Sequence, residues 1–337
     1  MDAPPPAAID DRVLAGALRD RWSLDTTALS YVPKGVGSYH WRVDAEGMTY
    51  FVTVDDLATK PWLGHELDDT FEGLECAYET AWQLHHDDRL DLVVAPVRTR
   101  QGAVLVRLDE RHTMAVFPFV DGEATAWGDA ISDDRRAALL HALGRVHGAA
   151  RGDDTRVPRR GHGLPGREHL LDAMASLDRP WQSGDHGARV QQALRAHETE
   201  VRARLARFDA LAAQLDASQR ATVITHGEPH PGNLIHTRDG VRLVDWDTVA
   251  LSEPERDLWM LDRGRGSLDA YVAATGRTLD AVALEFHRLS WTMSDIVSYT
   301  ALFRRGQPRT RWADAKLTGL VALLAGAESL PYGEPSP

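Results

Sequence analysis

The first third of the chain alternates apolar and polar residues at a spacing that predicts a small sheet. Short apolar or β-branched runs are separated by turn residues, which is typical of consecutive strands. The predicted strands are residues 28–33, 41–43, 48–54, 92–96, 103–108 and 113–120. Residues 9–22 and 70–87 instead repeat apolar residues every three or four positions, the period of an amphipathic helix. The pattern therefore indicates a β-rich unit over residues 1–120.

Beyond residue 120 the pattern becomes mainly helical, and Ser132 supplies an N-cap for the first helix of this part. The predicted helices are residues 137–147, 170–177, 189–215, 253–261, 268–274, 279–303 and 312–323. We therefore expect an α+β protein with a small β-rich lobe over residues 1–120 and a larger helical lobe over residues 121–330. Residues 331–337 are expected to form a disordered tail.

A strand and a hairpin interrupt the helical part over residues 222–248. The loop 226–232 contains two prolines and two glycines, so it continues neither a strand nor a helix. An Asp-Gly turn then predicts a hairpin whose two ends carry Asn233 and Asp245, close to Glu228 of the loop. Two carboxylates and an amide are suited to a hard cation such as Mg²⁺, so this segment predicts a metal site.

A zinc site is an alternative for the same loop, because His226, Glu228 and His230 alternate and would face one way on a strand. Pro229 and Pro231 oppose a strand here, and the sequence offers no evident third ligand. We therefore expect His230 to be a structural hydrogen-bonding residue.

Composition and charge limit the classes of function. The chain has 337 residues, of which 43% are hydrophobic and 26% charged, as in ordinary globular proteins. A net charge of −12 argues against nucleic-acid binding and is compatible with a cationic small substrate. The single cysteine, Cys76, excludes an internal disulfide, and neither a signal peptide nor a membrane helix is apparent. We expect a cytoplasmic protein without membrane or nucleic-acid partners, as a monomer or homodimer.

The spacing His226-Gly-Glu228-x₄-Asn233, followed by a hairpin, Asp245 and then Asp257, resembles the catalytic segment of aminoglycoside phosphotransferases. These are small-molecule kinases with a two-lobed protein-kinase-like fold, and the spectinomycin-type enzymes are the most similar in pattern. The resemblance implies transfer of the γ-phosphoryl group of ATP or GTP to a hydroxyl group. It places Glu228 at the position of the catalytic aspartate and Asn233 and Asp245 as ligands of Mg²⁺, with His226 bracing the loop.

Two positions depart from the family's pattern. Glu228 is one methylene longer than the aspartate, which changes its reach. The phosphate-binding lysine is absent from the third strand, where Thr53 lies near its place. Lys60, just beyond that strand, is our first candidate for the missing charge, and Lys34 and Arg42 are the alternatives.

In protein kinases a glutamate of the following helix pairs with the strand lysine, and Glu75 and Glu79 are the candidates by position.

The resemblance also implies a nucleotide site between the lobes. Its phosphate loop would include Gly35, Gly37 and Ser38, because glycine lets the backbone approach the phosphates. Residues 115–122 are the expected hinge between the lobes, and the backbone of Phe117, Phe119 and Val120 is expected to contact the nucleobase. A plain edge strand remains the alternative for this segment.

The substrate is the least specified part. Trp291, Asp295 and Tyr299 resemble the substrate-side helix of spectinomycin-type enzymes, so Asp295 and Tyr299 join Glu228 as candidate substrate contacts. Residues 151–165 are expected to be a polar loop, a flap over the substrate being one interpretation. We expect an antibiotic as acceptor, an aminoglycoside or another hydroxyl-bearing compound such as a nucleoside, which would confer resistance. The alternatives are a small metabolite alcohol, and a nucleotide-binding pseudokinase with a regulatory role.

Overall fold

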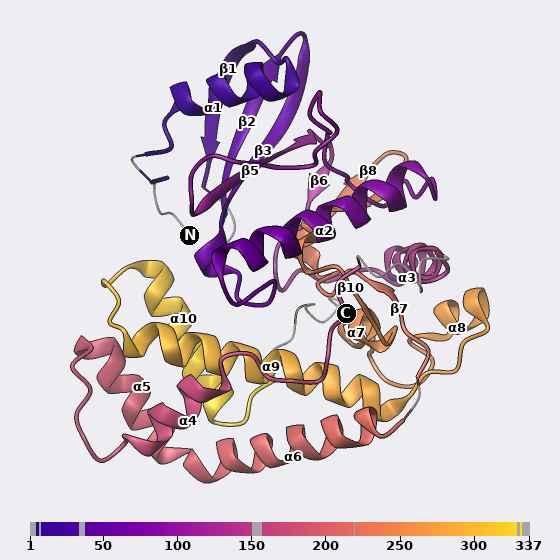
Figure 1. Cartoon of the computed structure of the whole chain (residues 1–337). Coiled ribbons are helices and arrows are strands. Elements are labelled where there is room, and N and C mark those ends of the chain that lie inside the picture. The colour runs from indigo at the N-terminus through magenta and orange to yellow at the C-terminus, as the bar shows by residue number, and fades with distance from the viewer. Residues whose placement is uncertain are drawn as a thin grey trace.

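The computed structural model describes residues 5–6, 8–33, 38–149, 157–218, 220–328 and 331. Its N-terminal lobe is a five-stranded antiparallel sheet in the order β1-β2-β3-β5-β4 (Figure 1). The strands are β1 Thr26–Val32, β2 Ser38–Ala45, β3 Met48–Asp56, β4 Val106–Arg107 and β5 His112–Pro118. The helix α1, Asp11–Ala17, continues into a π-helical turn, Leu18–Trp22, and both pack on one face of the sheet. The long helix α2, Leu67–His86, packs on the other face.

The alternation of β3 decides which side chains reach the space between the lobes. Val52 and Val54 are fully buried in the core under α1. Thr53 and Asp55 therefore point to the opposite face, toward α2. Tyr78 of α2 confirms this direction, because its hydroxyl donates to Asp55 Oδ2 at 3.1 Å.

The C-terminal lobe carries most of the helices, with two small sheets at its junction with the other lobe (Figure 1). The strand β6, Glu123–Ala124, pairs with the hairpin of β8, Leu234–Thr237, and β9, Gly240–Leu243; β7, Val223–Thr225, pairs with β10, Ala250–Ser252. The helices are α3 Asp133–His147, α4 Arg167–Ala175, α5 Gly184–Ala196, α6 Glu198–Asp216, α7 Glu255–Leu258, α8 Asp269–Thr275, α9 Ala281–Arg304 and α10 Arg311–Leu324. One core joins α4, α5, α6, α9 and α10, and a second joins α3, α8 and the hairpin.

Side-chain caps explain where several helices begin. Ser132 accepts from Arg135 N at the start of α3, as the sequence predicts. Asp280 and Thr310 do the same for α9 and α10. Such caps satisfy backbone donors that have no partner within the helix.

Three sequence predictions of local structure are wrong. Residues 92–96 form no regular strand, because their hydrogen bonds go to the C-terminal lobe: Val94 N donates to Leu243 O (3.1 Å) and Leu243 N to Leu92 O (2.7 Å). The strand expected over residues 103–108 is reduced to Val106–Arg107. The helix expected over residues 189–215 is two helices that meet at His197.

Among the residues that the structure describes, no helix has both the length and the apolar character needed to cross a membrane.

Candidate active site

The loop between β7 and β8, which we call the catalytic loop after the resemblance described above, is held by hydrogen bonds to a buried carboxylate. Asp257 of α7 is fully buried and accepts from His226 N (2.8 Å) and Gly227 N (2.6 Å). His147 of α3 contacts the same carboxylate at 3.1 Å. Gly227 has φ +97°, and a Cβ there would overlap the Arg256 guanidinium, so glycine is required. Asp257 therefore fixes the shape of the loop.

His226 joins the loop to the end of β9. Its Nε2 lies 3.0 Å from Val244 O, and its Nδ1 accepts from Glu228 N at 3.1 Å. Burial lowers the pKa of His226 to about 4, which keeps the ring neutral with Nε2 as the donor. Because both ring nitrogens have protein partners, the zinc alternative is not supported. Within the described ranges, no group of three or more His, Cys, Asp or Glu side chains is arranged for a metal ion.

Glu228, Asn233 and Asp245 lie near one another, because Asn233 bonds to Glu228 and the charge of Glu228 acts on Asp245. Asn233 Nδ2 donates to the backbone O of Glu228 (3.0 Å), so Oδ1 is the atom of this side chain that could bind a cation. Burial acts to raise the pKa of Glu228, but His230, His226 and Arg256 together hold it below the usual range, so the side chain is a carboxylate. Burial and the neighbouring Asp247 raise the pKa of Asp245 well above its usual value. A divalent cation would relieve this crowding of negative charge, so the residues present fit Mg²⁺.

Lys60 lies at the centre of the space between the lobes. It is only 3% exposed, and its Nζ is 2.5 Å from Asp247 Oδ2 and 3.1 Å from Asp55 Oδ1. Burial opposes its charge, but Asp247, Asp55 and Asp245 raise the pKa of Lys60 above its usual value, so it is an ammonium. A lysine from beyond β3 thus places a positive charge beside the predicted metal site. We refer to Lys60, Asp55, Asp247 and Tyr78 as the Lys60 cluster.

The partners of Lys60 differ from those that the sequence suggests. In the described part of the chain the ion pairs of Lys60 are with Asp55 and Asp247, and Glu79 pairs with Arg98, so the prediction that Glu75 or Glu79 pairs with the lysine is wrong. Lys60 instead pairs with Asp55 of the strand before it, and Tyr78 of α2 holds that aspartate. Arg42 lies over the Phe119 ring, 5.1 Å from its centroid, and Lys34 lies outside the described residues.

Thr53, which lies near the place of the missing lysine, is on the face of β3 that points toward α2. Its hydroxyl is 3.2 Å from His40 Nδ1.

The predicted nucleotide site is only partly described. Gly35 and Gly37 lie outside the described residues, and Ser38 begins β2 and donates to Asp55 Oδ1 at 2.6 Å. The predicted phosphate loop therefore ends at the Lys60 cluster. In the hinge, the Phe117 ring packs on Tyr78 of α2, and Phe119 N donates to Thr49 O at 3.2 Å. Because the backbone N–H of Phe119 already has a partner, Val120 is a better candidate than Phe119 to donate a hydrogen bond to the nucleobase.

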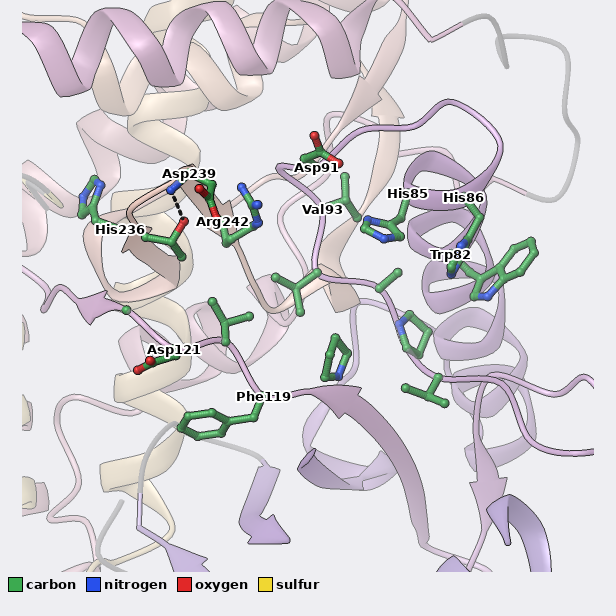
Figure 2. Close-up of a pocket in the computed structure, with 18 of the residues that line it drawn as sticks. Trp82, His85, His86, Asp91, Val93, Phe119, Asp121, His236, Asp239 and Arg242 are labelled. Atoms are coloured by element: carbon green, nitrogen blue, oxygen red, sulfur yellow. Dashed lines mark hydrogen bonds between the residues drawn. The ribbon is translucent and has the colours of Figure 1, made fainter. Parts of the chain in front are cut away.

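A cavity of about 900 Å³ lies beside the segment predicted to be the hinge. Figure 2 shows Trp82, His85 and His86 of α2 on one side of it, His236, Asp239 and Arg242 of the β8–β9 hairpin on the other, and Phe119 and Asp121 at the hinge. Phe119 and Val120, two of the predicted nucleobase contacts, line this cavity, whereas none of the residues predicted to bind metal or to act as the base does.

The predicted substrate contacts share one face of α9. Trp291, Asp295 and Tyr299 are spaced four residues apart, so they lie in one row along the helix. Trp291 begins this row at the catalytic loop, where its ring centroid is 6.2 Å from that of His230. Tyr299 lies farther along, under Lys316 of α10 at 5.1 Å. The row therefore runs from His230 toward α10.

Three residues of the Lys60 cluster were not anticipated from the sequence: Asp55, Tyr78 and Asp247. Local signals existed for Asp247, which follows Asp245 in Asp-Trp-Asp, and for Asp55, which lies two residues after Thr53 and therefore on the same face of β3. Tyr78 reaches the cluster from α2 through a tertiary contact.

Comparison with known proteins agrees with this geometry. Residues 29–289 match the model of the APH phosphotransferase enzyme family, whereas no curated protein matches the chain. Spectinomycin phosphotransferase APH(9)-Ia, solved with ADP and spectinomycin, is similar with a TM-score of 0.73 and 15% identity, over 94% of this chain and 98% of that one. Macrolide 2'-phosphotransferase type I has a TM-score of 0.53 and 16% identity, over 97% and 100%. Choline kinase LicA from Streptococcus pneumoniae has a TM-score of 0.52 and 12% identity, over 94% and 99%. The two-lobed protein-kinase-like fold predicted from the sequence is confirmed.

Proposed function

Because the chain belongs to the APH phosphotransferase enzyme family, we propose that it transfers the γ-phosphoryl group of ATP or GTP to a hydroxyl of a small molecule. The observation that carries this proposal is the Lys60 cluster beside Asn233 and Asp245. It places an ammonium, an amide and several carboxylates where the two lobes meet. Phosphoryl transfer depends mainly on positioning and on stabilising negative charge, and these groups suit both tasks.

Each residue takes a role that its contacts support. Asn233 and Asp245 would hold Mg²⁺, which offsets charge on the phosphates when bound. Lys60 would hold a phosphate oxygen through its Nζ. Glu228 would orient the acceptor hydroxyl and take its proton, which its lowered pKa permits because it is ionised at neutral pH. Asp257 and His226 position the backbone of the loop that carries Glu228.

An antibiotic is the acceptor that we propose, with resistance as the consequence. Similar structures include a spectinomycin phosphotransferase, APH(2")-IIia in complex with GDP and kanamycin, and a macrolide 2'-phosphotransferase. They also include choline and ethanolamine kinases, so a metabolite alcohol is the second candidate. We further propose that the protein acts in the cytoplasm, as a monomer or homodimer, since its single cysteine suits a reducing compartment that also supplies ATP, GTP and magnesium.

A regulatory pseudokinase remains the alternative from another class, since Glu228 and Thr53 both depart from the family's pattern. The position of Lys60 argues for an enzyme, because it supplies the charge that Thr53 lacks.

A screen for nucleotide consumption tests the proposal. The purified protein is incubated with Mg²⁺ and ATP or GTP against aminoglycosides, nucleoside antibiotics, choline and ethanolamine, and products are read by mass. One added phosphoryl group on any acceptor supports the proposal. Binding of magnesium-nucleotide without turnover of any acceptor would favour the pseudokinase.

A further inference from the structure

Three aromatic rings from distant parts of the sequence meet beside the catalytic loop. The ring centroid of Trp127 lies 5.0 Å from that of His230 and 5.8 Å from that of Trp291. His230 Nε2 in turn lies 3.8 Å from Glu228 Oε2. One imidazole ring therefore separates the tryptophans from the proposed base, and we call Trp127, His230 and Trp291 the aromatic cluster.

Trp127 is the open member of this cluster. Its side chain is 46% exposed, whereas Trp291 also contacts Trp259, which is 3% exposed. The cluster is thus anchored in the C-terminal lobe at one end and presents Trp127 at the other. A large exposed aromatic surface beside a reactive group is typical of a ligand contact.

The backbone around Trp127 is tied to the catalytic loop. Thr125 Oγ1 donates to Pro231 O at 2.5 Å, and Asp129 Oδ2 accepts from Ala126 N at 2.7 Å, which closes a turn around Trp127. Gly128 N also donates to Pro331 O at 3.0 Å. A side chain whose backbone is already ordered loses little entropy when a ligand binds.

The arrangement of the rings distinguishes two kinds of substrate. A cage for a quaternary ammonium ion needs rings that surround the cation. Here the rings contact one another: Trp127 and Trp291 are stacked at 16°, and the edge-to-face ring of His230 has its centroid 5.0 Å from that of Trp127. No space is left between the rings to surround a cation, and the exposed indole of Trp127 is the surface offered to a ligand. A flat face suits the apolar side of a ring, such as a sugar, and does not enclose a small cation.

The geometry points to Trp127 as a platform for a cyclic alcohol, a sugar or aminocyclitol, whose ring lies on the indole with a ring hydroxyl directed to Glu228. The inference rests on the proposed function and narrows its substrate class. It places open-chain amino alcohols such as choline outside that class.

Steady-state kinetics with Trp127→Ala and Trp127→Phe test this specificity role. The probes are spectinomycin, kanamycin and 2-deoxystreptamine as cyclic acceptors, and choline and ethanolamine as open-chain acceptors. For a cyclic acceptor, Trp127→Ala raises KM by about tenfold or more, and Trp127→Phe, which keeps a flat face, stays within about threefold of wild type. The change in kcat is smaller than the change in KM, because Glu228 is untouched. Leu171→Ala on α4, which removes a 41% exposed apolar side chain elsewhere, is the control and leaves both constants unchanged.

A binding measurement keeps the inference testable without turnover. The chain has ten tryptophans, so the ligand-induced fluorescence change is compared between wild type and Trp127→Phe to isolate position 127. Loss of most of the fluorescence change in the variant, with a non-hydrolysable nucleotide present, supports the platform.

Turnover of a cyclic acceptor at an unchanged KM in Trp127→Ala would overturn the platform and leave the proposed kinase activity intact. Turnover of choline or ethanolamine alone would overturn it too, as would the failure of every cyclic probe to bind in a Trp127-dependent way. Trp127-dependent binding without any phosphoryl transfer would instead reject the proposed activity and keep the platform.

Discussion

Replacing Lys60 by methionine removes one charge from the space between the lobes at nearly constant length. Lys60 is one of only three lysines in the chain, and its ammonium contacts Asp247 and Asp55 at 2.5 and 3.1 Å. The variant leaves both carboxylates buried without their cation. It also removes the group that we propose to hold a phosphate oxygen.

Both effects have a magnitude that follows from these contacts. Breaking a buried ion pair by removing one partner destabilises a fold by about 3–5 kcal/mol. A hydrogen bond to a charged group contributes about 1.5–3 kcal/mol, so losing it at the phosphates lowers kcat/KM for the nucleotide by roughly 10- to 150-fold. We expect most of that loss in the KM for the nucleotide.

The stability loss of Lys60→Met should depend on pH in a defined direction. Burial already raises the pKa of Asp247, and Lys60 is the group that opposes the shift. Without Lys60 the folded-state pKa rises further above the unfolded value, so the folded protein binds a proton more readily than the unfolded chain. Stability is then lost as pH rises and partly regained as pH falls, so the difference in Tm from wild type should be larger at pH 8 than at pH 5.

The assay is nucleotide kinetics at saturating Mg²⁺, together with thermal unfolding at both pH values. Thr53→Lys added to Lys60→Met returns a cation to the same face of the site, and we expect it to recover part of the nucleotide affinity. Arg207→Met, which breaks an exposed pair with Glu285, is the control and should cost about 1 kcal/mol or less. A Lys60→Met enzyme with wild-type KM for nucleotide and an unchanged Tm at pH 8 would refute the reasoning.

Three further variants test the other roles. Glu228→Gln should lower kcat by about 10²–10⁴-fold with little change in nucleotide KM, and a loss below roughly tenfold would show that Glu228 is not the base. Asp245→Ala should abolish magnesium-dependent transfer while the circular dichroism spectrum stays that of wild type; normal turnover would refute the metal site. Asp257→Asn should cost about 3–5 kcal/mol at neutral pH, because it weakens the buried anchor of His226 and Gly227. Burial acts to raise the pKa of Asp257, but His147 and Arg256 hold it below the usual range, so this stability difference should be present above about pH 4 and shrink as the pH falls through the folded-state pKa.

The sequence predicted the catalytic hairpin because its parts are neighbours along the chain. The loop after β7, the Asp-Gly turn and the strand that leads to Asp245 fix one another within about two dozen residues, and local turn chemistry is enough to place them. The segment 92–96 shows the limit of the same method. Its apolar residues satisfy their backbone groups with β9 of the other lobe, and no periodicity reveals that partner.

The Lys60 cluster could be anticipated only in part for the same reason. Lys60 stood out because the strand lacked a lysine, yet Asp247 comes from the other lobe and Tyr78 from α2. Trp127 gave no signal at all, since an exposed tryptophan after a short strand has no pattern of its own. Its position beside His230 depends on the hydrogen bond of Thr125 to Pro231 of the catalytic loop and on the stacking of Trp291 of α9.

The electrostatics of the site bear on whether this chain is a working enzyme. Asp245 and Asp247 both have pKa values raised by burial and by neighbouring carboxylates, so keeping them ionised costs folding free energy. Lys60 offsets part of that cost and adds a buried charge of its own. Such an arrangement is unfavourable for stability alone, because apolar residues of similar size would pack there without a penalty. The arrangement becomes favourable when a metal ion and phosphate groups bind, because the metal ion compensates the carboxylates and the phosphates compensate Lys60. A scaffold that bound no nucleotide would gain nothing from these buried charges. A nucleotide-binding pseudokinase would share the gain, so turnover, and not nucleotide binding, distinguishes it from a phosphotransferase.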